Sequence, residues 1–455
     1  MAHYSPFRNS DFAKDTFFRK DCFRARLEAA RKAGRCAYVN EIRKINNSKE
    51  ARRWQGDIWL QDMFRDNWDA FLKENDRPEK PMRDPIKKNV EKMIACQDPD
   101  GGFFYYECPE CHDFCIVTHT CKSRFCPRCG KKYRDKVSAS VSKKMLAVPH
   151  RQLVFTVPPD LRPMMREHRE LLGELFAGVN EAMESIIKDK APAKYKKEGR
   201  RLGFVCFLHT YGRQLNWHPH IHILYAERWM DKEGKMGKLD FIPFAKIKLS
   251  FMYIMCRRIR EFYLGEYGKG PEYFACCRLL KDVIAHHPNG FYFYGPKRDE
   301  ETTITSVKAM AGYIARYASH PAISERRIER YDPSSKTVTW FYDPHEDDGK
   351  DPDDPKLIGR QHITEPCAEF MKRLIIHIPD SGFQQIRYYG FYSNAWNARP
   401  EGAGRLFPDG EIMAMRKKNR WEDGIVEAFG YDPLICSCGR RMEYVREKSN
   451  LEGFT

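Results

Sequence analysis

The sequence has no apolar run that approaches the roughly 18 residues needed to cross a membrane. Its first segment, Met1 to Lys20, is polar and of mixed charge, so we predict no signal peptide and a chain that stays in the reducing cytoplasm. The nucleotide-binding pattern GxxxxGK(S/T) is missing, and with it any helicase signature. There is no internal repeat and no low-complexity tract. These absences argue against a membrane protein, a secreted protein, a nucleotide-driven motor and a repeat protein.

The composition is that of a basic globular protein. At 455 residues the chain exceeds one typical core, and we expect about two to four domains. Hydrophobic residues make up 42% and aromatic residues 13%, which excludes an intrinsically disordered chain. Lys and Arg total 79 against 63 Asp and Glu, a formal charge of +16 that favours a polyanion as partner, most often nucleic acid. The alternative is a soluble basic protein without such a partner.

The cysteines are clustered rather than scattered. Of 16 cysteines, seven fall between Cys96 and Cys129, which in a cytoplasmic chain argues for metal rather than disulfides. Two CxxC hooks stand out, with 14 residues between them, and four thiolates in this spacing predict one structural zinc. The predicted zinc ligands are Cys108, Cys111, Cys126 and Cys129, with Cys121 as an alternative ligand.

Basic residues surround the second hook. Lys122, Arg124 and Arg128 lie beside it, and a small zinc fold carrying such cations is a natural surface for docking DNA. The alternative is that zinc only replaces a core too small to hold itself together, and the two roles are compatible.

Hydrophobic periodicity predicts an α+β protein. In the middle of the chain the order strand-helix-strand-strand-helix-strand predicts a ferredoxin-like antiparallel sheet with helices on one face. The expected strands are 151–157, 203–209, 218–225 and 290–294, and the expected helices are 161–188, 244–264 and 307–318. The predicted regions are a helical basic segment at 1–90, the zinc-binding domain at 91–140, the catalytic domain at 141–325, and a hairpin and helical region at 326–455.

Histidines alternate along the third predicted strand, at His218, His220 and His222. Because side chains alternate across a strand, His220 and His222 share a face and can hold one divalent cation between them. A third ligand is expected, with His209 on the neighbouring strand as the first candidate and His218 as the second. Histidine pairs in sheets are also often structural, so the pair alone does not decide between the two roles.

Two tyrosines lie four residues apart on the last predicted helix of this region. Tyr313 and Tyr317 therefore share one side of it, and Arg316 lies between them. Together with the histidines they suit the cutting of a DNA strand whose end is held as a phosphotyrosine. A free phenol has a pKa of about 10, so attack at neutral pH needs the proton removed or the developing oxyanion stabilised. Arg316 or Lys308 could supply positive charge or hold a phosphate. The alternative is packing, which is the commoner role of such a pair.

Several motifs occur in one order along the chain, at 121–130, 154–159, 209–212, 218–222, 313–317, 321–324 and 386–390. Through them the chain resembles the rolling-circle insertion-sequence transposases of the HUH class, in the two-tyrosine branch with an N-terminal transposase zinc-binding domain. The resemblance runs from about Lys92 to Glu443. It implies that His220 and His222 are the HUH metal ligands and that Tyr313 and Tyr317 are paired nucleophiles.

The resemblance also implies an activity and partners. The expected reaction is nicking of single-stranded DNA at element ends through a 5′-phosphotyrosine, with Mg or Mn as the catalytic ion, and transfer of the strand to a target DNA. Host replication or helicase factors are expected partners, a homodimer is left open, and the location is the cytoplasm, on the nucleoid through DNA. The alternatives are a replication initiator or relaxase with the same chemistry, and a non-catalytic zinc-containing DNA-binding protein.

The C-terminus departs from the family pattern. The family tends to carry CxxC-G there, whereas this chain has Cys436-Ser-Cys438-Gly439. With one residue fewer and no evident partner pair, we predict no second zinc at this segment.

Overall fold

The structure is a computed structural model that describes residues 59–96, 102–112, 114–190, 192–239, 242–296, 303–317, 322–344 and 359–417, most of 432–448, and the single residues Ala29 and Ala33. The predicted helical segment at 1–90 is therefore described only from α4 (Trp59–Asn75) onward. Pro321 and the side chains of Cys115 and Arg128 also lie outside the described residues. Within the described part, no helix is both long enough and apolar enough to span a bilayer.

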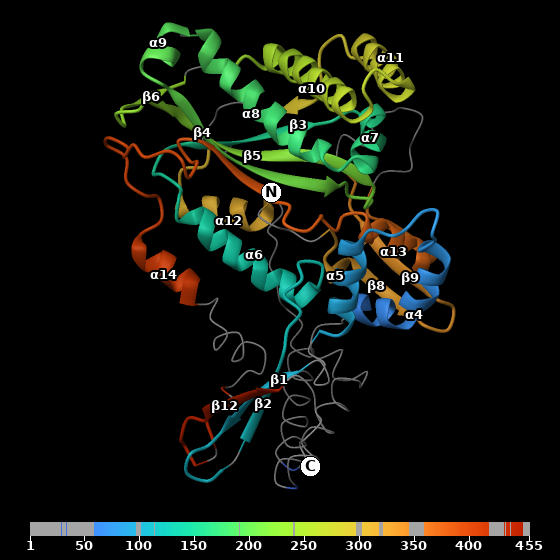
Figure 1. The fold of residues 1–455 in the computed structure, drawn as a ribbon. Helices are drawn as coiled ribbons and strands as arrows, with labels where there is room; N and C mark the ends of the chain where they lie inside the picture. Colours follow the sequence, from blue (N-terminus) through green and yellow to red (C-terminus); the bar gives the residue numbers. More distant parts are fainter. Residues whose placement is uncertain are drawn as a thin grey trace.

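A six-stranded antiparallel sheet forms the centre of the molecule (Figure 1). Its strands lie in the order β11-β4-β5-β3-β7, with the short β6 paired to β5. Strands β3, β4, β5 and β7 take the ferredoxin-like arrangement that was predicted, because β5 lies between the parallel β3 and β4 and β7 pairs with the other edge of β3. The strands are β3 (His150–Thr156), β4 (Arg201–Tyr211), β5 (Trp217–Met230), β6 (Met236–Lys238), β7 (Phe293–Tyr294) and β11 (Ile386–Gly390).

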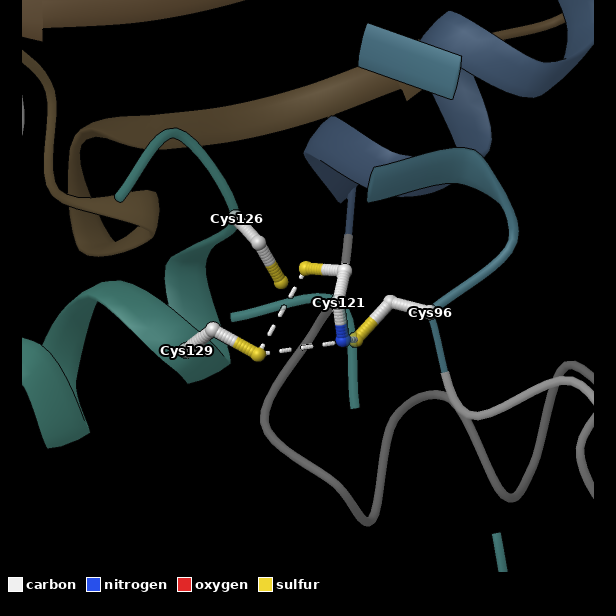
Figure 2. Close-up of side chains that lie close together, drawn as sticks. All are labelled: Cys96, Cys121, Cys126 and Cys129. Atoms are coloured by element: carbon white, nitrogen blue, oxygen red, sulfur yellow. Dashed lines mark hydrogen bonds between the residues drawn. The ribbon is translucent and has the colours of Figure 1, made fainter. Parts of the chain in front are cut away.

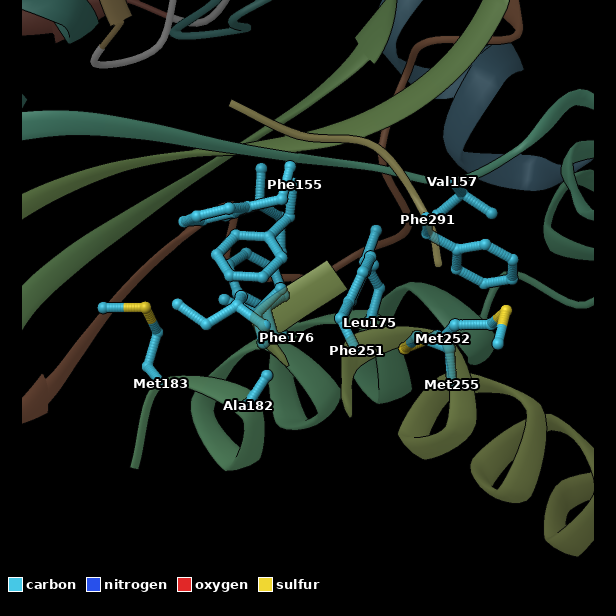
Figure 3. Close-up of a cluster of buried hydrophobic side chains, with 14 of the residues drawn as sticks. Phe155, Val157, Leu175, Phe176, Ala182, Met183, Phe251, Met252, Met255 and Phe291 are labelled. Carbon is cyan, nitrogen blue, oxygen red and sulfur yellow. The ribbon is translucent and has the colours of Figure 1, made fainter. Parts of the chain in front are cut away.

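The larger hydrophobic core lies between this sheet and the helices on one of its faces (Figure 3). Phe155 from β3 packs there against Phe251, with Phe176 and Met255 close by. The predicted helix 161–188 is interrupted at 168–170, where His168 ends the first segment. The helices on this face are α7 (Arg162–Glu167), α8 (Leu171–Lys190), α9 (Pro192–Lys197), α10 (Phe244–Tyr267) and α11 (Pro271–His286), with the short η2 (Pro159–Leu161) before α7.

The opposite face of the sheet is also covered, by α6 (Pro127–Ser142) and α12 (Val307–Tyr317) (Figure 1). Val205 and Leu224 point to this side and pack with Met310 and Ile314 of α12. A third helix, α14 (Asp409–Lys417), contacts α6. The predicted α+β fold with an antiparallel sheet is confirmed. Helices cover not only the predicted face but also the second one, where α12 carries the two tyrosines.

A second core joins segments from distant parts of the chain. Helix α4 and α5 (Asp84–Ile94) pack with a three-stranded sheet and α13 (Cys367–Ile375) around the completely buried Trp340. The predicted regions 1–90 and 326–455 thus share a core, which their separation in sequence concealed. The sheet consists of β8 (Ile328–Asp332), β9 (Thr337–Tyr342) and β10 (Gln361–Pro366), and η3 (Glu325–Arg327) precedes it.

A third, small sheet lies away from both cores (Figure 1). Strand β1 (Phe103–Glu107) is its centre, with β2 (Phe114–Thr118) on one side and the C-terminal β12 (Glu443–Lys448) on the other. The C-terminal strand therefore shares a sheet with a hairpin that lies more than 300 residues earlier in the chain.

Candidate active site and metal centres

Three histidines gather on the face of the central sheet that α12 covers. The β4–β5 register sets His209 opposite His220 and Phe207 opposite His222, so cross-strand pairing brings all three imidazoles to one place. One nitrogen of each lies within 4.8 Å of the others. His218 shares the face but is not part of this group, so the first candidate for the third ligand, His209, is the one that lies with the pair.

The imidazoles are held in the form that binds a cation. His220 donates from Nδ1 to the carbonyl of His218 at 2.7 Å, which leaves Nε2 facing Nε2 of His222 at 3.1 Å. Burial lowers the pKa of His220 to about 4 and the pKa of His222 well below its ordinary value, so both are neutral at pH 7. Two nitrogens bound at about 2.1 Å to one ion at right angles would lie about 3.0 Å apart, which fits the observed separation.

Tyr317 lies directly beside the histidines. Its ring centroid is 4.2 Å from that of His222, and its backbone carbonyl accepts a hydrogen bond from Nε2 of His209 at 3.1 Å. Gln152 of β3 donates from Nε2 to the Tyr317 hydroxyl at 3.3 Å. The last turn of α12 is thus anchored to the sheet through the same residues that form the site.

Tyr313 lies one turn deeper in the same helix. Its side chain is buried, and its hydroxyl donates to the backbone carbonyl of Ile223 in β5 at 3.1 Å. Burial, and then the neighbouring Tyr317, raise the pKa of Tyr313. The two rings are 4.6 Å apart, so both phenols belong to one site, but only Tyr317 faces the histidines.

Arg316 and Lys308 lie on the outer side of α12. Both are exposed, and the Arg316 guanidinium is 5.9 Å from the centroid of the Tyr317 ring. Both side chains are therefore accessible to a polyanion. The described hydrogen bonds of the two tyrosine hydroxyls are made with Gln152 and with the Ile223 carbonyl, not with Arg316 or Lys308.

The two CxxC hooks lie in different clusters, so the single four-cysteine site expected from their spacing is wrong. Cys126 and Cys129 gather with Cys96 and Cys121, whereas Cys108 and Cys111 gather with two cysteines from the C-terminal segment. Spacing could not reveal this, because a CxxC hook supplies only half of a tetrahedral site and says nothing of which second half it meets. The alternative ligand, Cys121, does lie with the second hook.

The first cluster, Cys96/Cys121/Cys126/Cys129, directs four side chains at a common centre (Figure 2). The Cys129 sulfur is 3.7 Å from that of Cys96 and 3.5 Å from that of Cys121. A tetrahedral zinc with Zn–S bonds of about 2.3 Å separates its sulfurs by about 3.8 Å, whereas a disulfide requires about 2.05 Å. The donor set therefore fits a structural zinc.

This cluster fixes the start of α6. Cys126 precedes the helix, Pro127 is its first residue, and the Gly130 amide donates to the Cys126 carbonyl at 2.7 Å. A Cβ on Gly130 would lie 2.7 Å from the Arg124 carbonyl oxygen, so the turn requires glycine. Helix α6 then contacts α12, so the zinc cluster is joined to the helix of the tyrosines through one rigid element.

The predicted DNA-contacting residues differ in their surroundings. Lys122 is exposed. Arg124 is partly buried, donates to Oε1 of Gln385 at 2.9 Å and lies 4.4 Å from the Tyr133 ring centroid, so it also holds the fold together. The interpretation of Lys122, Arg124, Arg128 and Arg316 as DNA contacts stays a prediction.

Sequence reasoning missed three contributors. Cys96 had no hook of its own, Gln152 is one of several polar residues in β3, and the C-terminal cysteines had no evident partner pair. For Gln152 the signal was its place in the alternation of β3, since Leu153 and Phe155 face the larger core and Gln152 therefore faces the histidine side.

The fold and these sites define an α+β protein with cysteine clusters that fit zinc and a histidine group beside helical tyrosines. Known transposases match the chain in these regions. Residues 203–399 match the family "Putative transposase", and residues 63–157 match the "Transposase zinc-binding domain". The chain is therefore similar to transposases over both its cysteine-rich segment and its central sheet.

Two relatives illustrate the similarity. The chain is 28% identical over 410 residues to the "Transposase for insertion sequence element IS801" of Pseudomonas savastanoi pv. phaseolicola. The aligned region covers 86% of this chain and 90% of that protein. It is 26% identical over 325 residues to the "Putative transposase y4qJ" of Sinorhizobium fredii, covering 68% and 75%. No solved structure gives a significant match.

Proposed function

We propose that this transposase cuts single-stranded DNA at the ends of its element and carries the cut strand as a 5′-phosphotyrosine on Tyr317. The observation that carries the proposal is the position of Tyr317, whose ring lies 4.2 Å from His222 in the three-histidine group. The nucleophile and the groups that would hold a cation therefore face the same point, as in-line attack on a phosphate requires.

The reaction transfers one phosphoryl group without loss of bond energy. Tyr317 gives up its phenol proton to solvent and its oxygen forms a bond to phosphorus. The bond from phosphorus to the 3′ oxygen breaks, and that oxygen takes up a proton to become the 3′ hydroxyl of the leaving strand. A divalent cation, Mg or Mn, would be held by His209, His220 and His222 and would supply Lewis-acid polarisation of the phosphate. Attack by a 3′ hydroxyl of target DNA on the phosphotyrosine reverses the bond changes and joins the strands.

Gln152 supports the nucleophile. Its amide hydrogen bond to the Tyr317 hydroxyl points the phenol and would stabilise the negative charge that develops on it. The neutral histidines leave their nitrogen lone pairs free for the cation rather than for protons.

Tyr313 would act second. Its hydroxyl is engaged with the Ile223 carbonyl, so it has to leave that bond before it can reach a phosphate. A pair of tyrosines allows two covalent ends during strand exchange, and the deeper one is held back until the first is occupied. Strand separation would come from host factors or from supercoiling, since the chain lacks a helicase signature.

A covalent-adduct assay tests this proposal. Wild-type, Tyr317→Phe and Tyr313→Phe proteins are incubated with labelled single strands from the sequence that flanks the gene, with Mg or Mn, and separated on denaturing gels. We expect a metal-dependent adduct with wild type, nearly none with Tyr317→Phe, and a first-strand adduct with Tyr313→Phe. An adduct of wild-type yield in the double Tyr→Phe variant would exclude the phosphotyrosine, and tight DNA binding without any adduct would favour a non-catalytic DNA-binding protein.

A further inference from the structure

The second cysteine cluster joins the turn after β1 to the C-terminal segment. Cys108 and Cys111 follow β1, and Cys436 and Cys438 precede β12, yet one sulfur of each lies within 4.8 Å of the others. Cys111 is 3.2 Å from Cys436 and 3.8 Å from Cys438, and Cys108 is 3.6 Å from Cys438. These separations are close to the edge of about 3.8 Å of a tetrahedral zinc site and too long for disulfides.

Each pair of cysteines is presented by a tight turn. After the first pair, His112 has φ +58° and its amide donates to the Cys108 carbonyl at 3.1 Å. After the second, Gly439 has φ +85° and donates to the Cys436 carbonyl at 2.9 Å. The shorter CxC-G spacing therefore still closes a turn, because glycine takes the left-handed conformation there.

The C-terminal segment packs into the predicted zinc-binding domain at 91–140. Strand β12 pairs with β1 from Phe103 opposite Lys448 to Glu107 opposite Glu443. Between the turns, Arg440 and Glu110 form an ion pair of 2.7 Å. A small core of Tyr106, Leu434 and Met442 lies beneath the cysteines.

We propose that Cys108, Cys111, Cys436 and Cys438 bind a second structural zinc, which fastens the C-terminal segment to the N-terminal zinc module. Four thiolates with no histidine or carboxylate among them are the donor set of closed structural zinc sites. The zinc-domain match ends at residue 157, so it contains half of these ligands and leaves Cys436 and Cys438 unassigned.

The site has a mechanical consequence. Cys111 and Cys436 are 325 residues apart, and one ion joining them closes a loop that contains the central sheet, the histidine group and α12. Because a small three-stranded sheet buries little apolar surface, the metal supplies most of what holds its third strand in place. The proposal does not depend on DNA cleavage.

Cobalt substitution of the full-length protein tests the site. Thiolate-to-cobalt absorption counts sulfur sites and does not register a histidine site, and Co²⁺ is added to metal-free protein until the absorption saturates. We expect two tetrathiolate sites per wild-type chain. The double variant Cys436→Ser with Cys438→Ser should lose the proposed site and retain the first cluster. The double variant Cys96→Ser with Cys121→Ser should lose the first cluster and retain the proposed site.

Two further variants keep the test decisive. Cys111 and Cys438 are exposed, so Cys111→Ser with Cys438→Ser removes two ligands without opening a core. This variant should also retain one site, and its helical circular dichroism signal should equal that of wild type. Cys277→Ser, whose half-buried thiol lies in neither cluster, is the matched control and should retain both. The proposal would be overturned by a wild-type chain that saturates with one thiolate site. It would also be overturned by full absorption in the two double variants of the proposed site, Cys436→Ser with Cys438→Ser and Cys111→Ser with Cys438→Ser.

Discussion

We predict that His150 makes the stability of the domain around the central sheet depend on pH. It begins β3, is completely buried, and makes two hydrogen bonds of 2.7 Å, from Nδ1 to the Val148 carbonyl and between Nε2 and the Tyr392 hydroxyl. A carbonyl only accepts, so Nδ1 carries the proton and Nε2 accepts from Tyr392. Burial lowers the pKa of His150 to about 4. Tyr392 is the titratable group that faces it, and burial raises the pKa of that phenol, which stays neutral.

The size of the effect follows from linkage. The unfolded chain binds a proton on this residue below its ordinary pKa of about 6.5, whereas the folded chain does so only below about 4. The contribution to stability is therefore complete above pH 6.5 and is lost as the pH falls from 6.5 toward 4. At about 1.36 kcal/mol per unit, the loss is about 2 kcal/mol at pH 5 and about 3 kcal/mol at pH 4.

The variant His150→Phe isolates this contribution. Phenylalanine keeps a ring where His150 lies 6.0 Å from the Tyr392 ring centroid, and it cannot titrate. Urea denaturation of the zinc-saturated wild type and variant gives the free energy of unfolding at pH 7 and at pH 5, and the difference is the loss for each protein. The other buried histidines titrate equally in the two proteins, so their contribution cancels in the comparison. Wild type should lose about 2 kcal/mol more than the variant. Equal losses would refute the reasoning.

Three further predictions follow from the sites. Gln152→Ala should lower the rate of adduct formation by about tenfold to a hundredfold with unchanged DNA binding, because the 3.3 Å bond to Tyr317 is lost, and single-turnover kinetics measure it. Gly130→Ala should destabilise the first zinc cluster by roughly 1–3 kcal/mol, since its Cβ meets the Arg124 carbonyl, and faster zinc release to a chelator measures it. His209→Ala should weaken Mn binding about tenfold to a hundredfold while the melting temperature changes little, which calorimetry with Mn checks.

The sheet and its histidines could be predicted from the sequence because local patterns determine them. Short apolar runs define β3 and β4, and the alternation in the first half of β5 puts His220 and His222 on one face. The pairing of β11 with β4 could not be predicted, because the two strands are separated in the sequence by most of the other helices and strands. The cover that α6 and α12 provide for the second face has no local signature either.

The metal sites show where spacing fails. A hook such as Cys126-x2-Cys129 is a local feature, but its partners Cys96 and Cys121 are chosen by the tertiary fold. The same holds for Cys108 and Cys111, whose partners lie at the other end of the chain. Gln152 is similar, because only the packing of α12 on the sheet brings its amide to Tyr317.

Peptide mapping of the covalent adduct tests the central claim most directly. Trypsin separates the two tyrosines, since cleavage after Lys308, Arg316 and Arg326 puts Tyr313 in the peptide 309–316 and Tyr317 in 317–326. After nuclease trimming of the DNA-linked protein, fragmentation in the mass spectrometer shows which residue carries the remaining 5′-nucleotide. Fragmentation also assigns the nucleotide to one tyrosine where trypsin has not cut after Arg316 and both tyrosines remain in the peptide 309–326. We predict that Tyr317 carries it in wild-type protein after the first cut. A nucleotide found on Tyr313 alone, or on neither tyrosine, would contradict this account.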